Sequence, residues 1–201
     1  MNTKFSKGLW YTSVGGIMCG RSEMIMPIGV GNLQKGEKYN FKKDNQNSID
    51  IRRRYANMDY LAASVIQLFM VLIILISYDI ACQWFVNLYK RMDEHWPADL
   101  KVPPSIKLIP AIPKLHEPMH GRKNHQMYSL NFITGVGKAD METPERVWAG
   151  HNRLGNSTKT QGPGGRHDVL DDHFGFWNWS KYISIGKTLK SRYTAGLAER
   201  N

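Results

Sequence analysis

The feature that most constrains the fold is an uncharged run at residues 61–77, LAASVIQLFMVLIILIS, which Asp79 follows closely. Gln67 interrupts the run, and its length is at the short limit for a helix that spans a bilayer, which needs about 20 residues. Its first part favours a helix, whereas MVLIILIS is rich in β-branched residues and predicts a strand buried on both faces. We therefore expect a core strand here and no membrane partner.

The segments on either side of this strand, at about 71–78, predict helices. One helix is expected to begin at Asn57 or Asp59 as N-cap and to end near Phe69. A second is expected at about 80–95, where apolar side chains recur every four residues and form one stripe. That stripe consists of Ile80, Trp84, Leu88 and Met92.

Glycine and proline divide the rest of the chain. The segment LWYTSVGGIMC predicts a strand that runs into a turn, and MPIGVGNLQKGEKY predicts a loop. Residues 40–54 are polar and predict a loop without a packing face. The prolines between 97 and 113 predict an extended connector with at most a short edge strand.

The C-terminal third predicts helices joined by a basic loop. A helix is expected to begin near Thr143, with Pro144 in its first turn. The segment GNSTKTQGPGGRHD follows and predicts a loop rich in glycine and hydroxyl groups. The last residues predict a helical tail.

The charge of the chain favours a polyanionic partner. Lysine and arginine number 27 against 17 acidic residues, so the formal net charge is +10. Nucleic acid and an anionic membrane surface both fit this excess. The two cysteines, Cys19 and Cys82, do not make a disulfide framework, and the N-terminal residues lack the apolar core of a signal peptide, so an intracellular setting is expected.

Acidic side chains near expected element ends are candidates for metal chemistry. Asp79 follows a strand, and strand ends open onto the crevice where α/β folds bind ligands, so it fits a divalent cation site. The alternative is that Asp79 caps the helix at 80–95. Glu142 and Glu145 either interact favourably with the dipole of their helix or provide a second ligand that faces Asp79.

A thiol and imidazole set is a second candidate. His116 and His120 are four residues apart, and with Cys82 or Cys19 they fit Zn²⁺, which prefers such ligands. The alternative is that these residues are ordinary parts of the core. Arg153, Lys159 and Arg166 are candidates for contacts with the phosphates of DNA.

Seven segments in this order resemble one family, the Kyakuja-Dileera-Zisupton (KDZ) transposases, which are abundant in basidiomycete fungi. The resemblance runs from about Lys7 to about Leu197. The segments are GIMCGRSE, GVGNLQKGEKY, RYANMDY, ISYDIACQW, IPKLHEPMHG, YSLNFITGVGKADMETPERVWA and STKTQGPGGRHDVLDDHFGFWNW.

The resemblance implies a ribonuclease-H-like α/β core, in which a mixed sheet is flanked by helices and long loops. It implies acidic residues that hold Mg²⁺ or Mn²⁺ for DNA cleavage and strand transfer, with Asp79 as the second catalytic acid and Glu145 as the third. Asp140 and Glu142 are secondary candidates for the final acid. DNA as partner, oligomerisation and a nuclear location are also implied.

The departures from the family pattern imply a partial copy of that core over residues 1–201. The first catalytic aspartate of the family would lie upstream of residue 1, so little or no strand transfer is expected, and a non-catalytic DNA-binding remnant is the alternative. Ser22 and Asn124 replace a histidine and a cysteine of the family, which implies that a zinc site has been degraded. Residues 39–54 are expected to be an insertion or a retained intron.

The residues assigned to that degraded zinc site are Cys19, Cys82, His116 and His120.

Overall fold

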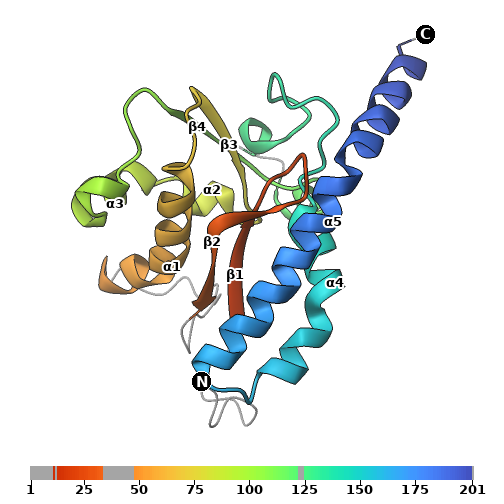
Figure 1. Cartoon of the computed structure of the whole chain (residues 1–201). Helices are drawn as coiled ribbons and strands as arrows, with labels where there is room; N and C mark the ends of the chain where they lie inside the picture. Colours follow the sequence, from red (N-terminus) through yellow and green to blue (C-terminus); the bar gives the residue numbers. More distant parts are fainter. Residues whose placement is uncertain (1–10, 12, 34–47, 122–124, 201) are drawn as a thin grey trace.

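The computed structural model describes residue 11 and residues 13–33, 48–121 and 125–200, and the side chains of 48–54 are outside the description. Helices and strands are mixed along the chain, which confirms the α/β class. The described strands form two separate two-stranded sheets, not one mixed sheet. A hairpin lies in the middle, with α1 on one side and α4 and α5 on the other (Figure 1).

The central hairpin consists of β1 (Ser13–Met18) and β2 (Ile25–Leu33), which pair antiparallel. The loop expected from residue 26 is wrong for residues 26–33, which belong to β2, and the rest of that segment lies outside the described residues. Glycines of the hairpin serve close packing. A side chain added at Gly31 would meet Leu61 of α1 at 3.0 Å, and one at Gly16 would meet Trp148 of α4 at 3.2 Å. Both helices therefore approach the hairpin backbone closely.

The second sheet is the parallel pair of β3 (Ile73–Ser77) and β4 (Lys107–Ala111). β3 confirms the strand expected at 71–78, and β4 is the short proline-containing strand expected in the connector. The expectation that β3 is buried on both faces is wrong, since Ile73 is 59% exposed. Among the described strands β3 has β4 as its one neighbour, so no second strand covers it.

The first helix, α1 (Ser48–Ile66), begins earlier than expected. The polar segment at 48–54 was expected to be loop, but it contains neither glycine nor proline, so nothing in its backbone interrupts the helix. Asp59 therefore lies inside α1 and is not its N-cap. Residues 39–47 of the expected insertion lie outside the described residues.

The helix expected at 80–95 is divided into α2 (Ala81–Trp84) and α3 (Leu88–His95), with a turn between them. The predicted stripe is confirmed, because Trp84, Leu88 and Met92 are at most 9% exposed. They pack against α1 in the larger of the two core clusters. The turn keeps the stripe on one side, so both short helices face the same core.

Two long elements complete the fold: α4 (Thr143–Thr158), with Pro144 at its start as expected, and α5 (Pro163–Ala198). The basic loop expected over 155–168 is mostly helical, and its non-helical part is the turn at 159–162 between the two helices. α4 and α5 enclose the second core cluster with Ile25 of β2. No helix among the described residues is long and apolar enough to cross a membrane.

Three single turns of 3-10 helix lie between these elements: η1 (Ala98–Leu100), η2 (Glu117–Met119) and η3 (Gln126–Tyr128). η3 is held beside the end of β4, since the N–H of Ile112 donates to the carbonyl of Tyr128 at 2.9 Å. η2 and η3 carry the histidines of the sites described next.

Candidate metal centres

The parallel pairing of β3 and β4 brings Asp79 and His116 to the same place. Asp79 comes two residues after β3 ends, and His116 comes five residues after β4 ends. The carboxyl ends of parallel strands lie at one edge of the sheet, where ligands bind in α/β folds. The N-cap alternative for Asp79 is wrong, because Ile80 is the N-cap residue of α2 and no side chain caps that helix.

Glu145, in the first turn of α4, completes a group with these two residues. One ligand atom each from Asp79, His116 and Glu145 all lie within 4.8 Å of one another. His116 Nε2 is 3.6 Å from Asp79 Oδ2 and 4.0 Å from Glu145 Oε1. The carboxylates are about half exposed, so solvent and a cation can reach them.

Glu142 supports this group from behind. Its side chain is 6% exposed, and its Oε1 accepts a hydrogen bond from the N–H of Leu115 at 2.7 Å. Its Oε2 is 3.9 Å from His116 Nδ1, and both of these buried atoms lack a hydrogen-bond partner. A carboxylate behind the second ring nitrogen is the usual companion of a metal-binding histidine. The donor set and these two atoms therefore fit a divalent cation.

Asp140 is outside this group. Its carboxylate accepts two hydrogen bonds from Arg146, at 3.0 and 3.2 Å. The hydrogen bonds from Arg146 hold the pKa of Asp140 below its ordinary value. This aspartate is thus engaged in an ion pair, and an open hollow of about 380 Å³ lies beside it and Glu145.

A family model of the Kyakuja-Dileera-Zisupton (KDZ) transposase matches residues 49–178, well over half of the chain. The chain belongs to the KDZ transposase family. All three residues of the group lie inside the match, and so do residues 49–54 of the segment that was expected to be an insertion. Comparisons with curated proteins and with solved structures found no match.

This KDZ chain carries a second group of metal-binding side chains. Cys82, His120 and His125 each place a ligand atom within 4.8 Å of the other two. Cys82 Sγ is 3.6 Å from His120 Nδ1. Burial raises the pKa of the Cys82 thiol.

Of the four residues expected to form the zinc site, the structure brings together two, Cys82 and His120. His116 lies with Asp79 and Glu145 instead. Cys19 lies in the turn of the hairpin and belongs to neither group among the described residues. Burial alone would raise the pKa of Cys19, but hydrogen bonds from Ser22 lower it below its ordinary value.

The three basic candidates for DNA contacts differ in their surroundings. Arg153 and Lys159 are exposed, on α4 and just after it. Arg166 is half-buried and donates to Asn32 Oδ1 at 2.7 Å. Arg166 therefore contributes to packing between α5 and β2, whereas the other two face solvent.

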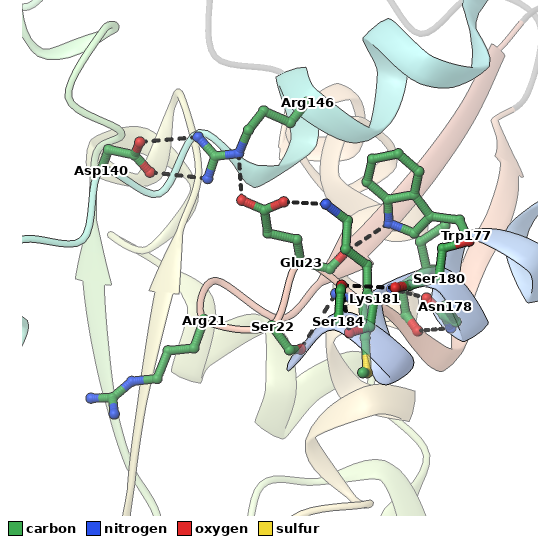
Figure 2. Close-up of polar contacts among 12 residues, drawn as sticks. Arg21, Ser22, Glu23, Asp140, Arg146, Trp177, Asn178, Ser180, Lys181 and Ser184 are labelled. Carbon is green, nitrogen blue, oxygen red and sulfur yellow. Dashed lines mark hydrogen bonds and ion pairs between the residues drawn. The ribbon is translucent and has the colours of Figure 1, made fainter. Parts of the chain in front are cut away.

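Glu23 is the centre of a charged network that the sequence analysis did not identify (Figure 2). Its carboxylate pairs with Arg146 of α4 and Lys181 of α5, each at 2.7 Å, and its carbonyl accepts from Trp177 at 2.8 Å. This network fixes α4, and with it Glu145, against the hairpin. The GRSE segment gave no spacing that pairs Glu23 with residues more than 120 positions away.

His125 was also missed. It lies just before η3 with its ring centroid 5.4 Å from that of His120, a contact that no sequence spacing indicated. The partners of His116 were missed for a similar reason. The contact between His116 and Asp79 can be recognised only when the parallel pairing of β3 and β4 is known.

Proposed function

We propose that Asp79, His116 and Glu145 hold a divalent cation in the DNA-processing centre of a ribonuclease-H-like transposase core. The observation that supports this is the closeness of Asp79, just after β3, to Glu145 on α4, which lies 66 positions further along the chain. Family membership supports the reaction class, which is metal-dependent cleavage and transfer of DNA strands. The proposal includes DNA as partner and the nucleus as the site of action.

The residues of this centre have separate roles in the proposal. Asp79 presents its carboxylate from a backbone held by the strand pair, since the Tyr78 N–H donates to the Ala111 carbonyl at 3.0 Å. His116 Nδ1 faces Glu142, so Nε2 is the ring nitrogen that would bind the cation beside the carboxylates. The chemistry that a bound cation supplies is activation of the attacking oxygen and stabilisation of the leaving oxygen.

The choice of cation follows from the donor set. Carboxylates suit Mg²⁺ and Mn²⁺ alike, whereas imidazole suits transition metals better than Mg²⁺. We therefore expect Mn²⁺ to bind more tightly than Mg²⁺. His116→Gln should reduce that preference, because it removes the donor that discriminates between the two ions.

DNA is proposed to approach along α4. Arg153 and Lys159 are exposed on and just after the helix that carries Glu145. The net charge of +10 supports an affinity that falls steeply with salt. The proposed centre contains two carboxylates, whereas phosphoryl transfer with two cations needs a larger number of carboxylate ligands. We therefore expect this chain alone to bind metal and DNA but to carry out little strand transfer.

A titration with MnCl₂ and MgCl₂ tests the centre, read by calorimetry and by the thermal unfolding midpoint. We expect Asp79→Asn and Glu145→Gln each to weaken Mn²⁺ binding at least about tenfold, because each removes one of three ligands. Glu94→Gln is the matched control, since Glu94 is an exposed acid outside both groups, and it should bind Mn²⁺ as wild type does.

Equal Mn²⁺ binding by all four proteins would contradict the proposed centre. DNA binding is measured on the same proteins at several salt concentrations. Salt-sensitive DNA binding without any metal response would favour the alternative function, a non-catalytic DNA-binding remnant of a mobile element.

A further inference from the structure

Two segments of the chain face each other across the edge of the parallel sheet and meet at two levels. Asp79 and Cys82 are three residues apart at the start of α2, and His116 and His120 are four residues apart on either side of η2. Asp79 faces His116 at the first level, and Cys82 faces His120 at the second. The second level has its own third member, His125, and shares no residue with the first.

The spacing at the second level fits the geometry of one zinc ion. With bonds of about 2.3 Å to sulfur and about 2.0 Å to nitrogen, two ligands of a tetrahedral ion lie about 3.5 Å apart. Cys82 Sγ and His120 Nδ1 are 3.6 Å apart. The third atom lies within 4.8 Å of both, so an inward shift of about 1 Å by the His125 ring closes the set.

We propose that Cys82, His120 and His125 form a Zn²⁺ site of their own, with water as the fourth ligand. One thiolate and two imidazoles are a soft donor set that suits Zn²⁺ and excludes Mg²⁺. All three residues are half-buried, so the ion has both a supporting wall and access to solvent. The site does not require the carboxylate centre and goes beyond its proposed function.

The consequence of this site is a brace between α2 and the chain around η2 and η3. His120 and His125 flank the short 3-10 turns η2 and η3, whereas Cys82 stands in a helix that packs on the core. An ion bound by Cys82, His120 and His125 would fix the position of η2. His120 follows η2, and His116 precedes it. Zinc would therefore position a ligand of the neighbouring centre without binding in it.

Substitution with Co²⁺ tests the site in the full chain. Thiolate coordination gives a sulfur-to-metal absorption in the near ultraviolet, and a tetrahedral site gives intense visible bands. We expect one Co²⁺ per chain with both signatures, displaced by one equivalent of Zn²⁺. Zinc at 100 times its Kd should raise the unfolding midpoint by about 5 to 10 °C.

Matched variants separate this site from other thiol chemistry. Cys82→Ser should abolish the sulfur absorption, and His125→Gln should weaken Zn²⁺ binding at least about tenfold. Cys19→Ser removes the other thiol and should leave both signals unchanged, as should Glu145→Gln, which disables only the carboxylate centre. In chelator, Cys82→Ser should melt at the temperature of the wild type, which shows that it folds.

Two results would overturn the proposal. One is a Co²⁺ spectrum without the sulfur absorption, which would leave Cys82 and His120 as a plain hydrogen-bonded pair. The other is equal loss of signal in Cys19→Ser and Cys82→Ser, which would show adventitious binding by either thiol.

Discussion

The buried ion pair of Asp59 and Arg91 is the residue-scale feature that ties α1 to the short helices. Asp59 accepts from Arg91 at 2.7 and 2.9 Å and from the Trp84 indole N–H at 2.8 Å, and both charged residues are 5% exposed. Arg91 also lies over the Tyr55 ring at 4.9 Å. This pair lies inside the larger core cluster, which supports the segment that carries Asp79 and Cys82.

Removing one member of this pair should be costly. Asp59→Ala leaves a buried guanidinium without its counter-charge, and we expect it to lower the free energy of unfolding by about 3 to 5 kcal/mol. Urea unfolding followed by circular dichroism measures the change.

The exposed pair of Lys90 and Glu94 on α3 provides the control. Its members are 71% and 48% exposed, so Glu94→Ala should cost about 0.5 kcal/mol or less. Similar costs for the two variants would mean that Asp59 and Arg91 are not held together in a dry environment.

Single residues explain which of the predicted site side chains lie together in the structure. The resemblance paired Asp79 with Glu145, and the structure brings their side chains together. The spacing of four residues suggested one face of a helix for His116 and His120, with a regular helix already doubtful because of Pro118. Pro118 lies between them and η2 is a 3-10 turn, so the two histidines meet different partners.

At the scale of elements, α5 combines a packed part and an exposed part. Leu170 and Phe174 are at most 8% exposed and pack on Val147 of α4 and Ile25 of β2. Asn178 adds a pair of hydrogen bonds to the backbone of Ile25, at 2.8 and 2.9 Å. Towards the C-terminal end the helix extends away from the rest of the molecule (Figure 1).

Two phenylalanines on α5 should separate packing from helix formation. Phe174→Ala empties a buried position and should lower the free energy of unfolding by about 3 kcal/mol. Phe176 is 71% exposed, so Phe176→Ala in the same helix should change it by about 0.5 kcal/mol or less. Equal effects in urea unfolding would contradict the docking of α5 on the hairpin.

Elements with a strong local signal were predictable, and those decided by packing were not. β3 follows from its β-branched run and the start of α4 from Pro144. β2 was missed because its glycines indicate a loop locally, whereas they serve the close approach of α1. The early start of α1 was missed because polar residues without an apolar stripe give no sign of where a helix begins.

At the scale of the whole molecule, Glu23 connects the hairpin to both long helices. Its side chain is 14% exposed and pairs with Arg146 and Lys181. Burial alone would raise the pKa of Glu23, but the hydrogen bond from Lys181 and the charge of Arg146 hold it below its ordinary value. The ionised form is therefore the one that stabilises the fold.

This network predicts a pH dependence of stability. A lowered pKa means that Glu23 contributes fully above its ordinary value of 4.5 and loses that contribution as the pH falls below it. Glu23→Gln should lower the free energy of unfolding by about 1 to 3 kcal/mol at pH 7. The difference from wild type should shrink as the pH falls from 4.5, measured by urea unfolding at each pH.

The control is Asp171→Asn, which changes an exposed acid on α5. Its difference from wild type should stay small throughout. A Glu23→Gln difference that is constant between pH 7 and pH 3 would show that the charge of Glu23 does not hold the helices in place.

The single neighbour of β3 has a consequence for how the chain behaves in concentrated solution. None of the described strands pairs with its second edge, so within the described part of the chain the backbone N–H and C=O groups beside the uncharged sequence VLIILIS have no strand partner on that side. Such an edge is a template on which another copy can add a strand, and long runs of this composition nucleate cross-β aggregates. The brevity of β3 and the charge of Asp79 at its end are the features that oppose this growth.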